Sequence, residues 1–214
     1  MTVMRNLTTG CLVKERTMTK RVVNSREVLR LWASAAQDSA RSGSVFFEGD
    51  TVYSYGRHWP LARICRGAGG TLVLTNSRRY SVTTAKHQGM ACGAVGDMRQ
   101  TAVPVVEDRG ADGHAVNLAY LTAKIATRLD RAARAMQTRT VERARDAARQ
   151  LHNDRADYAT FFEVESTFAP FPEVEFAAAF ARAGRIENPT PAQIAKRTRV
   201  RALRRAWAMI GAPA

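Results

Sequence analysis

The sequence predicts an α+β fold in which an N-terminal helix, an antiparallel β-meander of four to five short strands and a following helix precede a mostly helical C-terminal region with one long helix. Three observations lead to this prediction. Apolar and polar residues change to period two over 44–84, between stretches with helical spacing. No Gly or Pro occurs between Gly113 and Pro170, which favours a long helix there. With 214 residues, 45% of them hydrophobic, the chain can also bury a core.

The chain divides into four expected parts. Residues 1–23 lack periodicity and are predicted to form a flexible arm. An α+β module follows over 24–103, then a linker over 104–115, where Gly and Pro are frequent, and a helical region over 116–214. The first helix is expected to begin near Ser25, because Asn24 can cap it and Glu27 has the position of a capping box. Gly43 is its predicted end.

Short connections predict the meander. Gly49-Asp50 lies between two alternating stretches and is typical of a two-residue hairpin turn. A helix is expected to resume near Ala85, with Thr83 or Thr84 as its cap. The predicted strands cover 44–48, 51–55, 60–65, 71–75 and 79–84.

The long helix is predicted over 116–152, with an apolar stripe on one side and an Arg-rich face about 120° away. That Arg-rich face has two interpretations, external contact or an ordinary solvated surface, because Glu142 and Asp146 can pair with Arg145 and Arg149. The stripe also favours self-association. Its members are Leu118, Leu121, Ile125, Leu129, Met136 and Leu151.

The terminal helix, predicted over 191–210, has the clearest start signal. Thr190 can cap it, Pro191 suits its first position and Gln193 completes a capping box. One of its faces carries Arg197, Arg201, Arg204 and Arg205 and suits phosphate contact or an anionic lipid surface. The alternative is that this face docks on the acidic segment 157–187 of the same chain.

The formal charge of +14 comes from 33 Lys and Arg against 19 Asp and Glu, and 28 of the basic residues are Arg. Arginine binds phosphate with two donors at once, so a polyanionic partner is expected, although a basic composition that only solubilises the chain is the alternative. We expect no membrane span and a cytoplasmic location, in the host cell if the gene belongs to a phage. Three cysteines without metal-ligand spacing predict reduced thiols, no bound metal and no cofactor: Cys11, Cys65 and Cys92.

The stretch 46–88 carries a more distinctive pattern, FFEGDTVYSYGRHWPLARI followed after a spacer by LVLTNSRRYSVTTAKHQ. It resembles an uncharacterised domain of bacteriophage and mobile-element proteins, over roughly residues 24–95. Trp59 stands where that family more often has Phe. The resemblance implies phage ancestry and an α+β module, and it implies no activity. The matching residues are Phe47, Glu48, Gly49, Ser54, Tyr55, Gly56, His58, Pro60, Ala62, Tyr80, Ser81, Thr83, Thr84, Lys86 and His87.

The same motif has a chemical interpretation. The expected start of a helix, with hydroxyl groups and a lysine, suits an anion, so a phosphate or nucleic-acid site is predicted. It would comprise Tyr55, His58, Thr83, Thr84, Lys86 and His87. If His58, His87 and Lys86 converge, they could instead cleave a phosphodiester without metal, with one imidazole as base and the other as acid. The third interpretation is structural, with both histidines bonded within the fold.

Together these features predict a basic phage-type protein that binds nucleic acid mainly through Arg–phosphate contacts. Two alternatives stay open. One is a nuclease-like phosphodiesterase, and the other is an accessory protein that acts on a host or virion protein.

Overall fold

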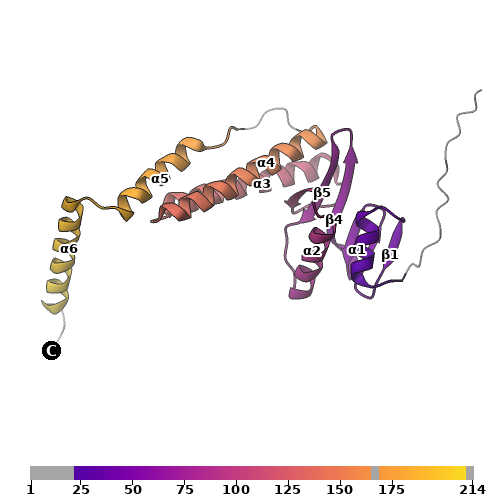
Figure 1. Ribbon diagram of the computed structural model, residues 1–214, viewed down its shortest axis with the longest axis horizontal. Helices are drawn as coiled ribbons and strands as arrows, with labels where there is room; N and C mark the ends of the chain where they lie inside the picture. Colours follow the sequence, from indigo (N-terminus) through magenta and orange to yellow (C-terminus); the bar gives the residue numbers. More distant parts are fainter. Residues whose placement is uncertain (1–21, 165–168, 211–214) are drawn as a thin grey trace, which may run out of the picture.

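A computed structural model describes residues 22–164 and 169–210, with side chains described as far as Ala202. It confirms the α+β class and the helical C-terminal region (Figure 1). The helices are α1 Ser25–Ala33, α2 Val82–Ala94, α3 Gly110–Arg134, α4 Thr138–Phe162, α5 Glu173–Glu187 and α6 Pro191–Ile210. The strands are β1 Ser39–Arg41, β2 Val45–Glu48, β3 Thr51–Ser54, β4 Gly56–Gly67, β5 Gly70–Asn76 and β6 Arg99–Val103.

The six strands form one sheet whose spatial order is the chain order, β1 to β6. The first five pair antiparallel, as the predicted meander requires. β6 pairs parallel to β5, so α2 is the crossover of a β5–α2–β6 unit. The sequence did not predict β6. The strand predicted over 79–84 was wrong, because α2 already begins at Val82 and Ser81 is its cap.

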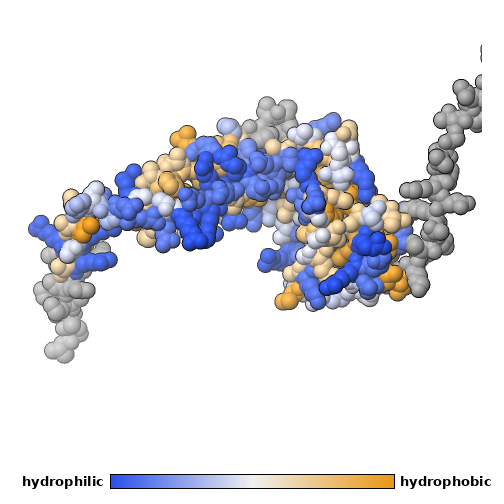
Figure 2. All heavy atoms as spheres, viewed as in Figure 1, coloured by the Kyte–Doolittle hydropathy of each residue, from blue (hydrophilic) through white to orange (hydrophobic). Residues whose placement is uncertain are grey.

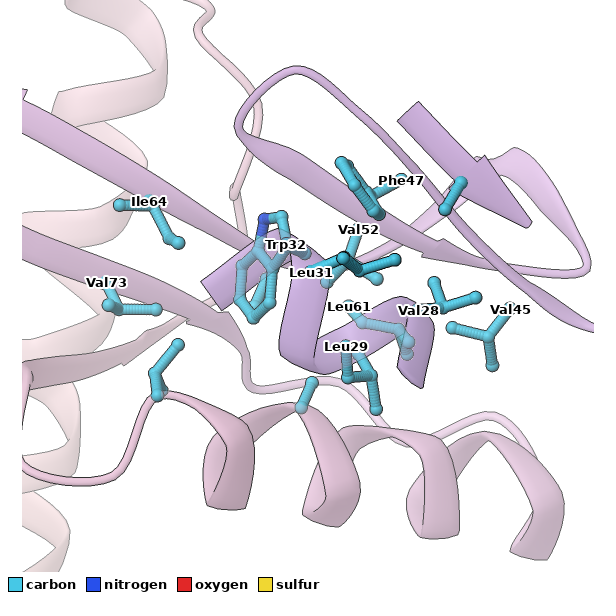
Figure 3. Packing of buried hydrophobic residues seen from close by; sticks show 14 residues of the cluster. Val28, Leu29, Leu31, Trp32, Val45, Phe47, Val52, Leu61, Ile64 and Val73 are labelled. Carbon is cyan, nitrogen blue, oxygen red and sulfur yellow. The ribbon is translucent and has the colours of Figure 1, made fainter. Parts of the chain in front are cut away.

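α1 and α2 cover one face of the sheet. The buried apolar side chains between these two helices and the strands form a cluster that we call the sheet core. Its largest side chain is Trp32, whose indole N–H donates to the carbonyl of Asp50 at 2.8 Å. Figure 3 shows the labelled side chains of this cluster pointing into the space between the sheet and the helices. The predicted cap of α1 is confirmed, since Asn24 accepts a hydrogen bond from the backbone N–H of Glu27. The predicted end at Gly43 was wrong, because α1 ends at Ala33 and β1 follows.

The other face of the sheet carries α3 and α4, which pack against it through the interface core. This cluster joins sheet and helices in one apolar interior. Tyr158 and Leu121 are its largest fully buried side chains besides those of the strands. The members are Cys65, Leu72, Leu74, Val103, Val106, Leu121 and Tyr158.

The single long helix predicted over 116–152 was wrong. The chain turns at Ala135, whose ψ of 140° is extended, so α3 and α4 form an antiparallel helical hairpin. Neither Gly nor Pro marks the turn. The physical reason is burial: one straight helix would leave its apolar stripe in water, whereas two helices bury it between them. The hairpin core is made of Ala132, Ala135, Val141, Ala144, Ala148, Phe176, Ala179 and Ala183.

One further boundary differs from the expectation: the linker predicted over 104–115 is shorter, because α3 begins at Gly110. α5 runs through Gly184 to Glu187. The terminal helix is confirmed over Pro191–Ile210, and its capping box forms, since Thr190 N–H donates to Gln193 Oε1 at 2.9 Å. None of the described helices has the combination of length and apolar character that a bilayer crossing requires.

Candidate nucleic-acid interface

The two halves of the sequence motif meet at His87. This imidazole is only 6% exposed, and its Nδ1 lies 2.7 Å from the hydroxyl of Ser54, with Nε2 at 3.5 Å from the hydroxyl of Ser44. Burial, and secondarily the charge of Lys86, lowers the pKa of His87. The residue is therefore a neutral hydrogen-bond partner that fixes α2 to β3, which is the structural interpretation of this histidine.

Tyr55 and Gly56 follow at the end of β3. Tyr55 has a positive φ of 61°, and its ring lies 5.8 Å from the ring of His87 while the residue stays 63% exposed. At Gly56 a Cβ would come within 2.6 Å of the imidazole of His58. With a side chain at this position the exposed ring of His58 would have to move, so glycine lets the ring lie directly over the backbone.

The structure does not bring the two imidazoles of the catalytic hypothesis together. His58 is exposed and lies against Gly56, whereas both ring nitrogens of His87 face serine hydroxyls in the interior. Within the described residues no hydrogen bond or ring contact joins His58 to His87 or to Lys86. A histidine acts as a general base through a ring nitrogen that has no other partner, and both ring nitrogens of His87 already face serine hydroxyls.

The loop between β5 and α2 has a fixed shape. Its start is a local turn in which the backbone N–H of Arg78 donates to Asn76 Oδ1 at 2.9 Å. The side chain of Gln88 donates to the carbonyls of Asn76 and Arg78, at 3.0 and 2.6 Å. The ring of Tyr80 lies 5.4 Å from that of Trp59. These contacts hold the loop on α2 and on β4.

The loop ends in a reciprocal capping box. Ser81 Oγ accepts from the backbone N–H of Thr84, and Thr84 Oγ1 accepts from that of Ser81. Thr84 is thus buried and occupied by the cap, so it is not available to a ligand. Thr83, one residue earlier, is exposed on the first turn of the helix.

Unpaired basic groups gather at this loop. Arg78, Arg79 and Lys86 are exposed, and the described part of the chain gives them no carboxylate partner. Tyr80 is 79% exposed beside them. No acid occurs between Asp50 and Asp97. The other arginines of that stretch nevertheless form ion pairs, with carboxylates that lie outside the stretch in the sequence. Those ion pairs are Arg57–Glu48, Arg63–Asp108 and Arg66–Asp50.

We call the group formed by Arg78, Arg79, Tyr80, Thr83 and Lys86 the β5–α2 surface. Sequence reasoning named Thr83 and Lys86 as site residues and Tyr80 only as part of the motif, and it missed Arg78 and Arg79. Two features of the sequence indicate this surface: the long stretch without acids, and the Arg-Arg-Tyr run between two turn-forming residues.

The basic helix α6 forms a second exposed surface. Arg197 and Arg201 are exposed and line a groove of about 680 Å³ with Met136 and Ile186. Among the described residues, none of the bases of α6 pairs with an acid of the segment 157–187. Two of those acids have other partners: Glu173 binds Arg145 and Arg149, and Asp157 binds Arg99. The side chains of Arg204 and Arg205 lie outside the described part of the chain.

The hairpin shows a third hydrophilic region, and its visible face is largely polar in Figure 2. Arg145 and Arg149 are neutralised by Glu173 of α5, not by the helix neighbours that the sequence suggested. Arg149 also lies over the ring of Phe171, 4.7 Å from its centre. These two arginines therefore hold α5 on α4, and their part of the Arg-rich face is occupied within the molecule.

Over the residues that the structure describes, no group of three His, Cys, Asp or Glu side chains is arranged to hold a metal ion. Comparison of the chain with protein-family models, curated proteins and solved structures found no match, so the site's chemistry is argued from its geometry alone.

Proposed function

We propose that the protein binds nucleic acid, with the β5–α2 surface and α6 supplying the contacts to phosphate. The observation that carries this proposal is the set of unpaired basic side chains around an exposed tyrosine, on a loop whose shape is fixed. A loop that is already ordered loses little conformational entropy on binding. The partner is a polyanion because Arg78, Arg79 and Lys86 have no carboxylate of their own in the described chain.

Tyrosine favours nucleic acid over other polyanions. A base has a flat face that can stack on the exposed ring of Tyr80, and such stacking contributes about 1–3 kcal/mol per base. Arginines next to an aromatic ring provide the backbone contacts that hold the strand there. Binding of this kind depends little on sequence and strongly on salt.

The test is a fluorescence-anisotropy titration of labelled single-stranded and duplex DNA over a range of salt concentrations. We expect tight binding at low salt, with a logarithmic slope that falls by about 0.7–0.9 for each phosphate contact removed. The variant that replaces Arg78, Arg79 and Lys86 with alanine should bind more weakly and with a shallower slope.

A matched control removes the same charge elsewhere. Arg30, Arg57 and Arg66 each pair with a carboxylate of the chain, so their replacement by alanine should leave the slope nearly unchanged. Absence of binding at low salt would contradict the proposed function. Equal losses in the two triple variants would mean that only net charge matters, and not this surface.

A further inference from the structure

A small cavity lies where the two parallel strands end. β5 ends at Asn76 and β6 at Val103, and the loop after each strand leads into a helix, α2 or α3. The cavity holds about 90 Å³ and is lined by residues of both loops and of the start of β4. The carboxyl ends of neighbouring parallel strands are where sheets of this kind place their ligands. The exposed Tyr80 lies next to this position, because its ring contacts that of Trp59, which lines the cavity.

The side chains around the cavity favour an anion. Arg78 comes from the loop after β5, Arg109 from the loop after β6, and His58 from β4. Glu107 is the one acid among the described lining residues, and its carboxylate lies 3.4 Å from the guanidinium of Arg109. Two arginines and one glutamate therefore line the cavity, which leaves one net positive charge for a ligand.

The framework of the cavity is rigid. Asn76 uses its side chain fully, because its Nδ2 donates to the carbonyl of Pro60 at 2.8 Å and its Oδ1 accepts from Arg78. The imidazole of His58 lies over Gly56, which has no Cβ. Trp59, another lining residue, has a buried indole N–H that finds no hydrogen-bond acceptor among the described residues. An unused donor next to the cavity also favours an anionic ligand.

The size of the cavity selects the form of phosphate. The cavity is small, about 90 Å³, so a ligand enters it with one small group such as a single phosphate. An internal phosphodiester carries a sugar on both sides and reaches into such a space less easily than a chain end does. A terminal phosphate monoester has one free side and carries about 1.5–2 negative charges at neutral pH.

We propose that this cavity binds the terminal phosphate of a nucleic-acid strand whose neighbouring nucleotides lie on the β5–α2 surface. The inference rests on the proposed function, because Arg78 belongs to both the surface and the cavity. The protein would then prefer strands with a phosphorylated end, whereas its other contacts do not distinguish one nucleotide sequence from another.

The experiment compares three forms of one single-stranded oligonucleotide, with a 5′-phosphate, with a 3′-phosphate or with hydroxyl groups at both ends. We expect at least one phosphorylated form to bind about tenfold more tightly than the hydroxyl form, which is the effect of one charge-assisted hydrogen bond. The two phosphorylated forms show which end enters. Inorganic phosphate should abolish the difference by competition.

Two single substitutions test whether the preference for phosphorylated ends arises at the cavity. Arg109→Ala should bring the affinity ratio of phosphorylated to hydroxyl oligonucleotide toward one, whereas Arg66→Ala, which removes an arginine that does not line the cavity, should keep it. Equal affinity of the wild-type protein for all three oligonucleotides would overturn this inference and leave the proposed function intact. Failure of all three to bind would overturn both.

Discussion

His87 illustrates how one buried hydrogen bond connects distant stretches of the sequence. Ser54 ends β3, His87 lies in α2, and their side chains meet at 2.7 Å in the interior. His58, which looks equivalent in the sequence, lies exposed against Gly56 instead. Two histidines in one motif therefore have different places, one in the interior and the other in the wall of the cavity beyond β5 and β6.

The pKa of His87 makes stability depend on pH. Because burial lowers its pKa, the unfolded chain takes up a proton below about pH 6.5 that the folded state excludes, and the free energy of unfolding falls as pH drops through that range. We expect urea unfolding to show this loss between about pH 7.5 and about pH 5.5. His87→Asn can still bond Ser54 but cannot titrate, so its loss should be smaller. Identical pH dependence in both proteins would contradict the assignment.

At the scale of elements, α6 is an isolated basic surface. Its capping box at Thr190 and Gln193 defines its start, and the bases of its described turns are exposed without ion pairs in that part of the chain. Local signals suffice for such a helix, because capping and helix propensity act within one turn. The sequence therefore predicted it well.

Replacing Arg197, Arg201, Arg204 and Arg205 together with alanine tests the role of α6. We expect weaker DNA binding and a flatter dependence on salt, because fewer counterions are released. The melting temperature should change little, because Arg197 and Arg201 are exposed and substitutions at such positions alter stability by within about 0.5 kcal/mol. An unchanged salt slope would show that α6 does not contact the nucleic acid.

At the scale of the whole molecule, the interface core joins the sheet to the hairpin. Leu121 and Tyr158 from the helices meet Leu72, Leu74 and Val103 from the strands. Leu118, Leu121 and Leu151 of the predicted apolar stripe pack here, within one chain, whereas Met136 of the same stripe is 69% exposed. The two layers are therefore expected to unfold as one cooperative unit.

Leu121→Ala measures this connection. Leu121 is 1% exposed, so its truncation leaves a cavity and should lower the free energy of unfolding by about 2–5 kcal/mol. Val116→Ala is the matched control on the same helix, because Val116 is exposed and its truncation should cost within about 0.5 kcal/mol. Urea unfolding compares the two. If both substitutions lowered the free energy of unfolding by similarly small amounts, the stability of the hairpin would not depend on its contact with the sheet.

Several features could be predicted from the sequence because they are local. Asn24, Gly49-Asp50 and Thr190 each act on their own turn or cap, and the structure has the first helix, the first hairpin and the last helix where they indicate. The β5–α2 surface was only partly predictable. Arg78 and Arg79 are visible in the sequence, but their lack of partners emerges only when every other arginine of that stretch is seen with its carboxylate.

The amino-acid sequence by itself determined the α+β class, the charge and the caps of the first and last helices, since these depend on composition and on neighbours within a few residues. Only the tertiary structure decided where the chain turns at Ala135, that 99–103 adds a parallel strand, and which histidine is buried. Each of these outcomes depends on apolar surface contributed by segments far apart in the chain. The free energy of burying such surface is a property of their contact, which no local pattern contains.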